Sequence, residues 1–246
     1  MKYLIFLILF SVFMVSSCEN DLGIELSKET FLPKITLLGD SDVNLPCGSS
    51  SYNDPGVDAT ENGAPVDVTT NVVSRYFGSS SITGPDVYDI SYVAVNKDGI
   101  PGSTFRTVVN PPCNGDLVSS LEGTYTSTIV RTSAAGANLT GPQYTNMKYI
   151  YIKKVSGNEY LISDAICGWY EIGRGLGPDF VAPGHKIFAN DIPGNDFSFG
   201  DAVEVGYFGG DAHITSFKVD ATSKVITIDT EWTAGFTFAI TLTQVN

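Results

Sequence analysis

The C-terminal segment of the chain alternates apolar and polar side chains residue by residue. Phe236, Phe238, Ile240 and Leu242 are separated by single Thr or Ala residues. Because successive side chains of a strand point to opposite faces, this pattern predicts a half-buried antiparallel strand. Similar short segments rich in Val, Ile, Thr and Tyr recur between Gly, Pro and Asn turns, and helical periodicity is nearly absent. The chain is therefore predicted to be all-β.

A turn-forming segment separates two strand-rich halves. Residues 110–116 read Asn-Pro-Pro-Cys-Asn-Gly-Asp, and two prolines followed by Gly are typical of a linker. The full length of 246 residues suits one large or two ordinary domains. We therefore predict a first domain at residues 32–112 and a second domain at residues 117–246.

The two halves differ in the kind of sheet they predict. In the first domain, about seven short strands are typical of a β-sandwich, and Tyr88, Ile90, Tyr92 and Ala94 share the face that should point into its core. In the second domain, successive strands joined by short turns predict an antiparallel meander. That meander closes into either a β-barrel or a β-sandwich.

The N-terminus has the features of a secretory signal. A single Lys2 precedes the apolar residues 3–15, a run too short for a stable membrane span, and small residues then lead to Cys18. Val15-Ser16-Ser17-Cys18 resembles the bacterial lipobox, which implies that residues 1–17 are removed and that Cys18 carries a lipid anchor. An ordinary signal peptide that leaves Cys18 unmodified is the alternative.

Acidic residues follow this cysteine. Glu19-Asn20-Asp21 resembles the export signal that sends lipoproteins of Bacteroidetes-type bacteria to the outside of the outer membrane, although such residues also suit a solvated linker. The resemblance implies an outer-membrane location facing the cell exterior. Residues 18–31 would then be a tether that holds the first domain clear of the bilayer.

Three segments of the first domain match one known family. Residues 33–39 (PKITLLG), 52–60 (YNDPGVDAT) and 88–94 (YDISYVA) resemble the bacterial surface immunoglobulin-like domain, which is also found in some pesticidal crystal proteins. The resemblance implies a spacer or adhesion module of immunoglobulin-like fold. It does not imply an enzyme.

The second domain carries a further resemblance. Together with the first domain, residues 121–125 (LEGTY) and 164–175 (DAICGWYEIGRG) resemble Bacteroides-type surface lipoproteins with an uncharacterised C-terminal β domain. Many of these are associated with polysaccharide-uptake systems, so the resemblance implies a role in glycan capture. It assigns no functional residue.

The net charge argues against a nucleic-acid partner, and the cysteines suggest an oxidising compartment. The formal net charge is −13, and the longest run of basic residues is Lys153-Lys154, so nucleic acid is not an expected partner. Cys47 lies near the second strand and Cys113 just after the last one. Since first and last strands often run side by side in sandwiches, a Cys47–Cys113 disulfide is predicted in an oxidising exterior, and Cys167 is expected to be a small buried residue.

The residues around position 170 form the main candidate binding site. Aromatic rings stack on the C–H faces of sugars, and charged side chains bond sugar hydroxyls, so this composition suits a glycan. Core packing and tight turns are the more common roles of such residues. The candidates are Asp164, Trp169, Tyr170, Glu171 and Arg174, with Trp232 and the Tyr207-Phe208 pair as secondary candidates.

The sequence offers little support for catalysis. No Gly-x-Ser-x-Gly motif occurs, and two histidines with scattered thiols suggest neither a catalytic triad nor a zinc site, so no metal and no cofactor are expected. A glycosidase would need two carboxylates in one cleft. The sequence cannot choose among many candidate carboxylates, and an acidic surface also explains them. The candidates are Asp164, Glu171, Asp179, Asp191, Asp196, Asp201, Glu204 and Asp211.

Three functions are compatible with these features. The leading hypothesis is a non-enzymatic surface lipoprotein whose second domain binds an extracellular glycan. A structural or accessory subunit that docks on an outer-membrane protein would instead show a broad apolar patch with a polar rim. A carrier of a small apolar ligand would enclose a cavity lined by residues such as Tyr149, Tyr151, Phe236 and Phe238.

Overall fold

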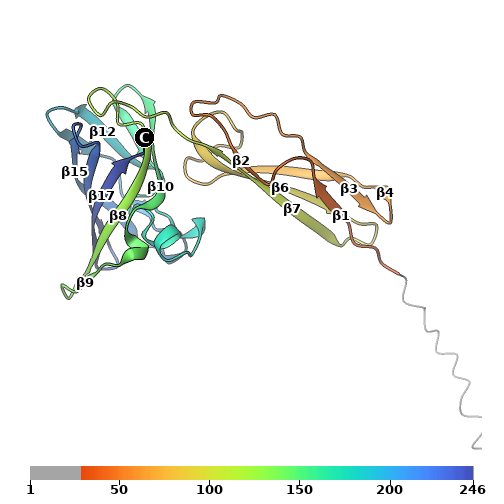
Figure 1. Cartoon of the computed structure of the whole chain (residues 1–246). Coiled ribbons are helices and arrows are strands. Elements are labelled where there is room, and N and C mark those ends of the chain that lie inside the picture. The colour runs from red at the N-terminus through yellow and green to blue at the C-terminus, as the bar shows by residue number, and fades with distance from the viewer. Residues whose placement is uncertain (1–28, 246) are drawn as a thin grey trace, which may run out of the picture.

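The computed structural model describes residues 29–245, and these form two β-rich domains joined end to end (Figure 1). The predicted signal peptide, the lipid anchor at Cys18 and most of the tether lie outside the described residues. No helix within residues 29–245 has the length and the apolar character needed to cross a membrane. Strands account for most of the regular structure, which confirms the prediction of an all-β chain.

The first domain is a sandwich of a three-stranded and a four-stranded sheet. The strand order is β1-β3-β4 in one sheet and β2-β7-β6-β5 in the other, where β2 runs parallel to β7 and the remaining pairs are antiparallel. The strands are β1 (Lys34–Leu37), β2 (Asp42–Asn44), β3 (Val57–Glu61), β4 (Ala64–Pro65), β5 (Val68–Ser74), β6 (Asp86–Val95) and β7 (Pro101–Asn110).

The core of this sandwich follows the predicted alternation along β6. Tyr88, Ile90, Tyr92 and Ala94 are all buried, as expected for alternate residues on one face. The same core holds the Arg106 side chain, which pairs with the Asp54 carboxylate and bonds the Tyr92 hydroxyl at 2.9 Å. Asp54, within the Asp-Pro-Gly turn, therefore neutralises a buried cation that would otherwise destabilise the domain.

The second domain is one ten-stranded sheet that curls around a single core. Its order is β13-β12-β11-β10-β8-β17-β16-β15-β14, with β9 paired to β8, and all pairs are antiparallel. One curled sheet is closer to the barrel alternative than to two facing sheets (Figure 1). The strands are β8 (Gly123–Ser133), β9 (Asn138–Leu139), β10 (Met147–Ser156), β11 (Glu159–Ile162), β12 (His185–Asp191), β13 (Asp196–Phe199), β14 (Val203–Glu204), β15 (Asp211–Asp220), β16 (Val225–Trp232) and β17 (Phe236–Gln244).

Four short helical turns interrupt this sheet. They are η1 (Pro142–Tyr144), η2 (Trp169–Gly173), η3 (Pro178–Phe180) and η4 (Gly206–Phe208). In β17, Phe238, Ile240 and Leu242 are buried and the intervening residues are exposed, which confirms the alternation from which the all-β prediction began. The turn η2 carries the candidate residues Trp169 and Tyr170, and η4 carries Tyr207 and Phe208.

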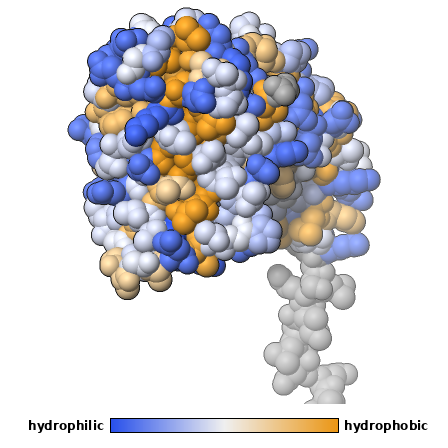
Figure 2. All heavy atoms as spheres, turned by 60° about the vertical axis from the view of Figure 1, so that its left-hand side comes forward, coloured by the Kyte–Doolittle hydropathy of each residue, from blue (hydrophilic) through white to orange (hydrophobic). Residues whose placement is uncertain are grey.

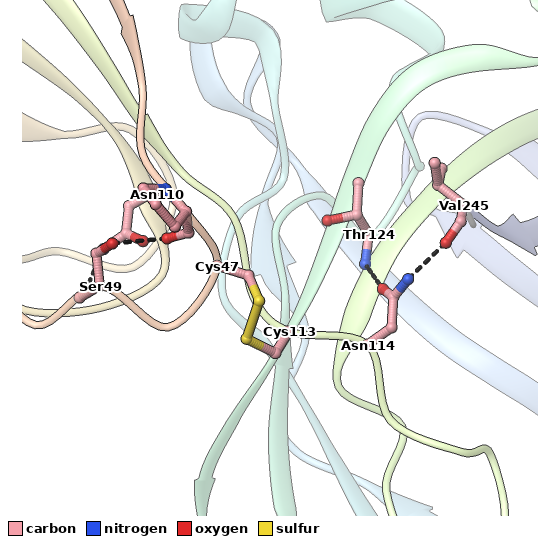
Figure 3. The surroundings of a disulfide bond; sticks show 8 residues. Cys47, Ser49, Asn110, Cys113, Asn114, Thr124 and Val245 are labelled. Atoms are coloured by element: carbon pink, nitrogen blue, oxygen red, sulfur yellow. Dashed lines mark hydrogen bonds between the residues drawn. A yellow bond between two sulfur atoms is a disulfide. The ribbon is translucent and has the colours of Figure 1, made fainter.

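The linker between the domains is held at both ends. Cys47 and Cys113 form a disulfide that joins the loop after β2 to the linker (Figure 3). On the other side, the Asn114 side chain bonds the Thr124 amide at 2.9 Å and also bonds the Val245 carbonyl. The disulfide joins residues 66 positions apart and therefore lowers the conformational entropy of the unfolded chain. The Asn114 side chain attaches the linker to the first and the last strand segments of the second domain.

Candidate binding site between the domains

The two domains meet at a small apolar cluster with one polar contact inside it. Tyr76 and Val87 of the first domain pack with Tyr151 and Val181 of the second. The Tyr76 hydroxyl donates a hydrogen bond to Glu171 Oε1 at 2.8 Å. Over residues 29–245, this is the one hydrogen bond that connects the domains. The relative position of the domains therefore depends on few contacts.

The environment of Glu171 favours its protonated form. Burial raises the pKa of Glu171 to about 7, and the negative charge of Asp164 adds to this effect, whereas the hydrogen bond from Tyr76 and the charge of Arg75 oppose it. Burial and the charge of Glu171 also raise the pKa of the Tyr76 hydroxyl, which keeps Tyr76 a donor. The contact thus contains a carboxyl group that titrates near neutral pH.

A groove of about 440 Å³ lies beside this contact and draws on both domains. Arg75 comes from the segment after β5 in the first domain, and the rest of the lining comes from the segments around η3, β14 and η4. Asp179 and Glu204 are the carboxylates in the groove, and both are exposed. We call this the interdomain groove, and its lining residues are Arg75, Pro178, Asp179, Val181, Pro183, Val203, Glu204 and Gly206.

Exposed aromatic rings stand next to the interdomain groove. Tyr207 directly follows the lining residue Gly206 and is 81% exposed, and Phe208 is 47% exposed. The Tyr207 ring lies 5.4 Å from the ring of Phe180, and Phe180 lies 4.9 Å from Phe208. Tyr207 is thus a large ring open to solvent that packs against the ring of Phe180.

Buried aromatic residues support this exposed pair from below. Tyr170 packs edge-on against Phe208 at 4.8 Å and against Trp232 at 5.6 Å. Trp232 Nε1 also donates to the Gly209 carbonyl at 3.1 Å, which ties the η4 loop to β16. Tyr170 and Trp232 therefore act as supports for the Tyr207-Phe208 loop, not as the surface that a ligand would touch.

Close backbone packing brings η3 and η4 together. A Cβ atom at Gly206 would collide with the Asp179 carbonyl, so only glycine allows this approach. As a result, Asp179, which lies 25 positions before Glu204 in the sequence, lines the same groove. The two loops form one continuous rim along the second domain.

Burial corrects the prediction that Trp169 and Asp164 face a ligand. Trp169 is 0% exposed and stacks on Tyr144 with ring centroids 3.6 Å apart. Asp164 is fully buried and accepts hydrogen bonds from the backbone amides of Ile166, Gly168 and Ala182 at 3.1, 2.7 and 2.9 Å. Both residues build the loop that carries η2, because a buried carboxylate is stable only when its oxygens accept such bonds.

The remaining predicted residues are spread over several environments. Glu171 lies in the interdomain contact, whereas Arg174 is exposed and does not line the interdomain groove. The cavity predicted for a small apolar ligand does not have the expected lining among residues 29–245. Tyr149 is 36% exposed, and Tyr151 packs against the first domain. No cluster of three or more potential metal ligands occurs in residues 29–245.

No sequence motif singled out Arg75, Tyr76 or Phe180. Arg75 and Tyr76 follow a strand of the other domain, so no local motif connects them with Glu171 or with the groove. The sequence does indicate that Tyr207 lies in a loop, because glycines on both sides of an aromatic pair are unusual for a buried strand. Residues 206–210 read Gly-Tyr-Phe-Gly-Gly.

Two family models match separate parts of the chain. A family model described as a C-terminal domain matches residues 114–244, more than half of the chain. The chain belongs to this family. A model for the Ig-like domain of bacterial surface proteins matches residues 35–109 of the same chain. The predicted resemblance to a surface protein with an N-terminal Ig-like domain is thus confirmed, and neither model describes an enzyme.

A solved structure shares the fold of this chain. The crystal structure of the lipoprotein BT2262 from Bacteroides thetaiotaomicron matches with a TM-score of 0.55 and 22% sequence identity, covering 87% of this chain and 100% of that chain. It supports an Ig-like domain followed by a β domain. No curated protein matches the sequence.

Proposed function

We propose that the protein is a lipoprotein, anchored through Cys18 to the outer membrane and facing the cell exterior, that binds an extracellular glycan in the interdomain groove. The family assignment and the Ig-like domain support a surface location, and the lipobox-like sequence supports the anchor. In a polysaccharide-uptake setting, such a protein would capture glycan before import. The first domain would hold the groove away from the membrane and contribute Arg75 to it.

The observation that carries this proposal is the exposed Tyr207 ring, which directly follows the lining residue Gly206 of a groove that also holds two carboxylates. A ring face is an apolar surface with a negative quadrupole, which suits the C–H groups of a sugar ring. Asp179 and Glu204 accept hydrogen bonds from hydroxyls. A volume of about 440 Å³ falls within the usual range for ligand sites.

The surroundings of the two carboxylates favour binding over hydrolysis. A glycosidase keeps its general acid protonated by placing it in an apolar, water-excluding pocket. Asp179 and Glu204 are both exposed to solvent, and neither belongs to an apolar cluster. We therefore propose a non-catalytic role for this groove, and a bound oligosaccharide should be recovered uncleaved.

The surface of residues 29–245 supports docking on an outer-membrane protein less well than it supports glycan binding. Phe105 is 67% exposed on the outer face of β7, but it pairs with the polar residue Ser91, which pairs in turn with Asn71 on the next strand. In the view of Figure 2, apolar residues form a narrow band broken by hydrophilic ones. A docking surface of standard size would need a broader continuous apolar area.

Replacing Tyr207 with alanine is expected to weaken glycan binding at least about tenfold, because the variant removes the stacking ring and leaves the groove charges in place. Tyr207→Phe, which keeps the ring, should retain most of the affinity. The measurement is a glycan panel titrated against the full chain, followed by calorimetry on the glycans that bind.

The matched control is Phe105→Ala, which removes an exposed ring from the first domain away from the groove. Equal affinity of the wild-type protein and of Tyr207→Ala would show that the site lies elsewhere. Absence of binding across a broad panel would reject the glycan proposal and favour the docking alternative.

A further inference from the structure

The charges that face the interdomain groove are mostly negative. Asp179 and Glu204 are the exposed carboxylates of the lining, and Arg75 is the one cation in it. Within the part of the chain that the structure describes, neither carboxylate forms an ion pair. Their charge is therefore compensated by solvent and not by a neighbouring side chain.

The positive charge of Arg75 is already used within the first domain. Its Nε and Nη2 atoms donate to the two carboxylate oxygens of Asp89, each at 2.7 Å. This fork geometry is the strong form of an arginine–carboxylate pair, and it holds the guanidinium in place. Asp89 also accepts a bond from Thr107 at 3.0 Å, which fixes the pair further. An anionic ligand would have to share the positive charge of Arg75 with Asp89.

The Nη1 atom of Arg75 has N–H donors that the Asp89 pair does not use. No hydrogen bond from Nη1 is formed within residues 29–245, and Arg75 lines the groove. The groove lining thus combines an arginine of the first domain that has unused N–H donors with two carboxylate acceptors of the second domain. A sugar hydroxyl can both accept and donate, so it matches the two sides, whereas a carboxylate or sulfate can only accept.

Building on the proposed glycan-binding role, we propose that the interdomain groove selects uncharged sugar residues and rejects glycans that carry carboxylate or sulfate groups at the bound position. The physical cause is repulsion from Asp179 and Glu204, which the Asp89-paired Arg75 does not offset. A net charge of −13 for the whole chain adds a repulsive long-range field.

The test compares each acidic oligosaccharide with its carboxyl-reduced form, which has the same backbone and linkages but a neutral –CH₂OH group. Both are titrated against the full chain by calorimetry. The neutral form that fits the groove is expected to bind about tenfold or more tightly than its acidic parent at low salt. The ratio should shrink at about 0.5 M NaCl, because salt screens charges in an open groove.

The paired variant is Asp179→Asn combined with Glu204→Gln, which preserves side-chain shape and changes only charge. Since both residues are exposed, the variant should fold normally. It is expected to bring the affinity for the acidic form to within about threefold of that for the neutral form, since the carboxylate repulsion is gone.

The possible results separate this inference from the function on which it rests. Equal affinity for the two forms in the wild-type protein, or discrimination that persists in the double variant, would overturn the charge selection and leave glycan binding intact. Binding of the acidic forms without binding of any neutral form would likewise overturn the charge selection alone. Failure of every glycan, neutral and acidic, to bind the wild-type protein would overturn both proposals together.

Discussion

Replacing Trp169 with alanine is expected to reduce the free energy of unfolding of the second domain by about 4 kcal/mol. Trp169 is fully buried, stacks on Tyr144 and meets the edge of Phe238 at 6.0 Å. These partners come from η1 and β17, which are far apart in the sequence. Removing the indole leaves a cavity that rigid strands cannot close, and the lost packing adds to the lost hydrophobic burial.

Denaturant unfolding followed by far-ultraviolet circular dichroism measures this effect. Tyr207→Ala is the matched control, because it removes an aromatic ring of the same domain that is exposed and should cost less than about 0.5 kcal/mol. A Trp169→Ala variant as stable as Tyr207→Ala would mean that Trp169 is not a core residue. Any loss of glycan binding in Trp169→Ala must therefore be corrected for unfolding.

Glu171 is expected to make stability decrease between about pH 4.5 and pH 7. Its pKa rises from an ordinary value of 4.5 to about 7 in the folded protein because it is buried. Below pH 4.5 the carboxyl is protonated in both the folded and the unfolded chain, so no penalty applies. Between these values the unfolded chain releases the proton and the folded chain keeps it, which costs up to about 3 kcal/mol by pH 7 and no more above it.

The matched variant is Glu171→Gln, which is neutral at every pH and can still accept the hydrogen bond from Tyr76. Denaturant unfolding of both proteins over pH 4 to 8 gives the difference in stability, in which the other titrating groups cancel. The variant is expected to become progressively more stable than the wild type as the pH rises from about 4.5 to 7, by up to about 3 kcal/mol. A difference that stays constant over this range would show that Glu171 has an ordinary pKa.

Ionisation of Glu171 is also expected to alter the position of residues that line the interdomain groove. Tyr76 donates to Glu171 and is adjacent in sequence to Arg75, which lines the groove, while Val181 belongs to both the contact and the groove. Weakening the contact would therefore displace Arg75 from Asp179 and Glu204. Domain docking and ligand binding share the same short segments of chain.

Local patterns were sufficient for the fold class and for the faces of individual strands. The buried residues of β6 and β17 were predicted correctly because alternation depends only on backbone geometry, which places every second side chain on the same face. The segments around Asp54-Pro55-Gly56-Val57 identified the Ig-like family for a related reason, since turn residues and strand residues are adjacent in the chain.

The binding surface depended on contacts between distant segments. Trp169 and Tyr207 have similar neighbours in the sequence, with glycine and a second aromatic residue beside each. Trp169 packs between Tyr144 and Phe238, whereas the Tyr207 ring packs only against the ring of Phe180 and is otherwise open to solvent. Local composition cannot distinguish these two outcomes, because burial is decided by what packs against a side chain.

The sequence by itself determined that this protein is all-β, that it has an Ig-like first half and a second β half, and that it carries a lipobox-like N-terminus. Only the tertiary structure decided which aromatic rings face solvent, that Glu171 contacts Tyr76, and that Arg75, Asp179 and Glu204 line one groove. The physical reason is the range of the interactions. Alternation and turns act between neighbouring residues, whereas a groove between domains exists only after segments about a hundred residues apart have packed together.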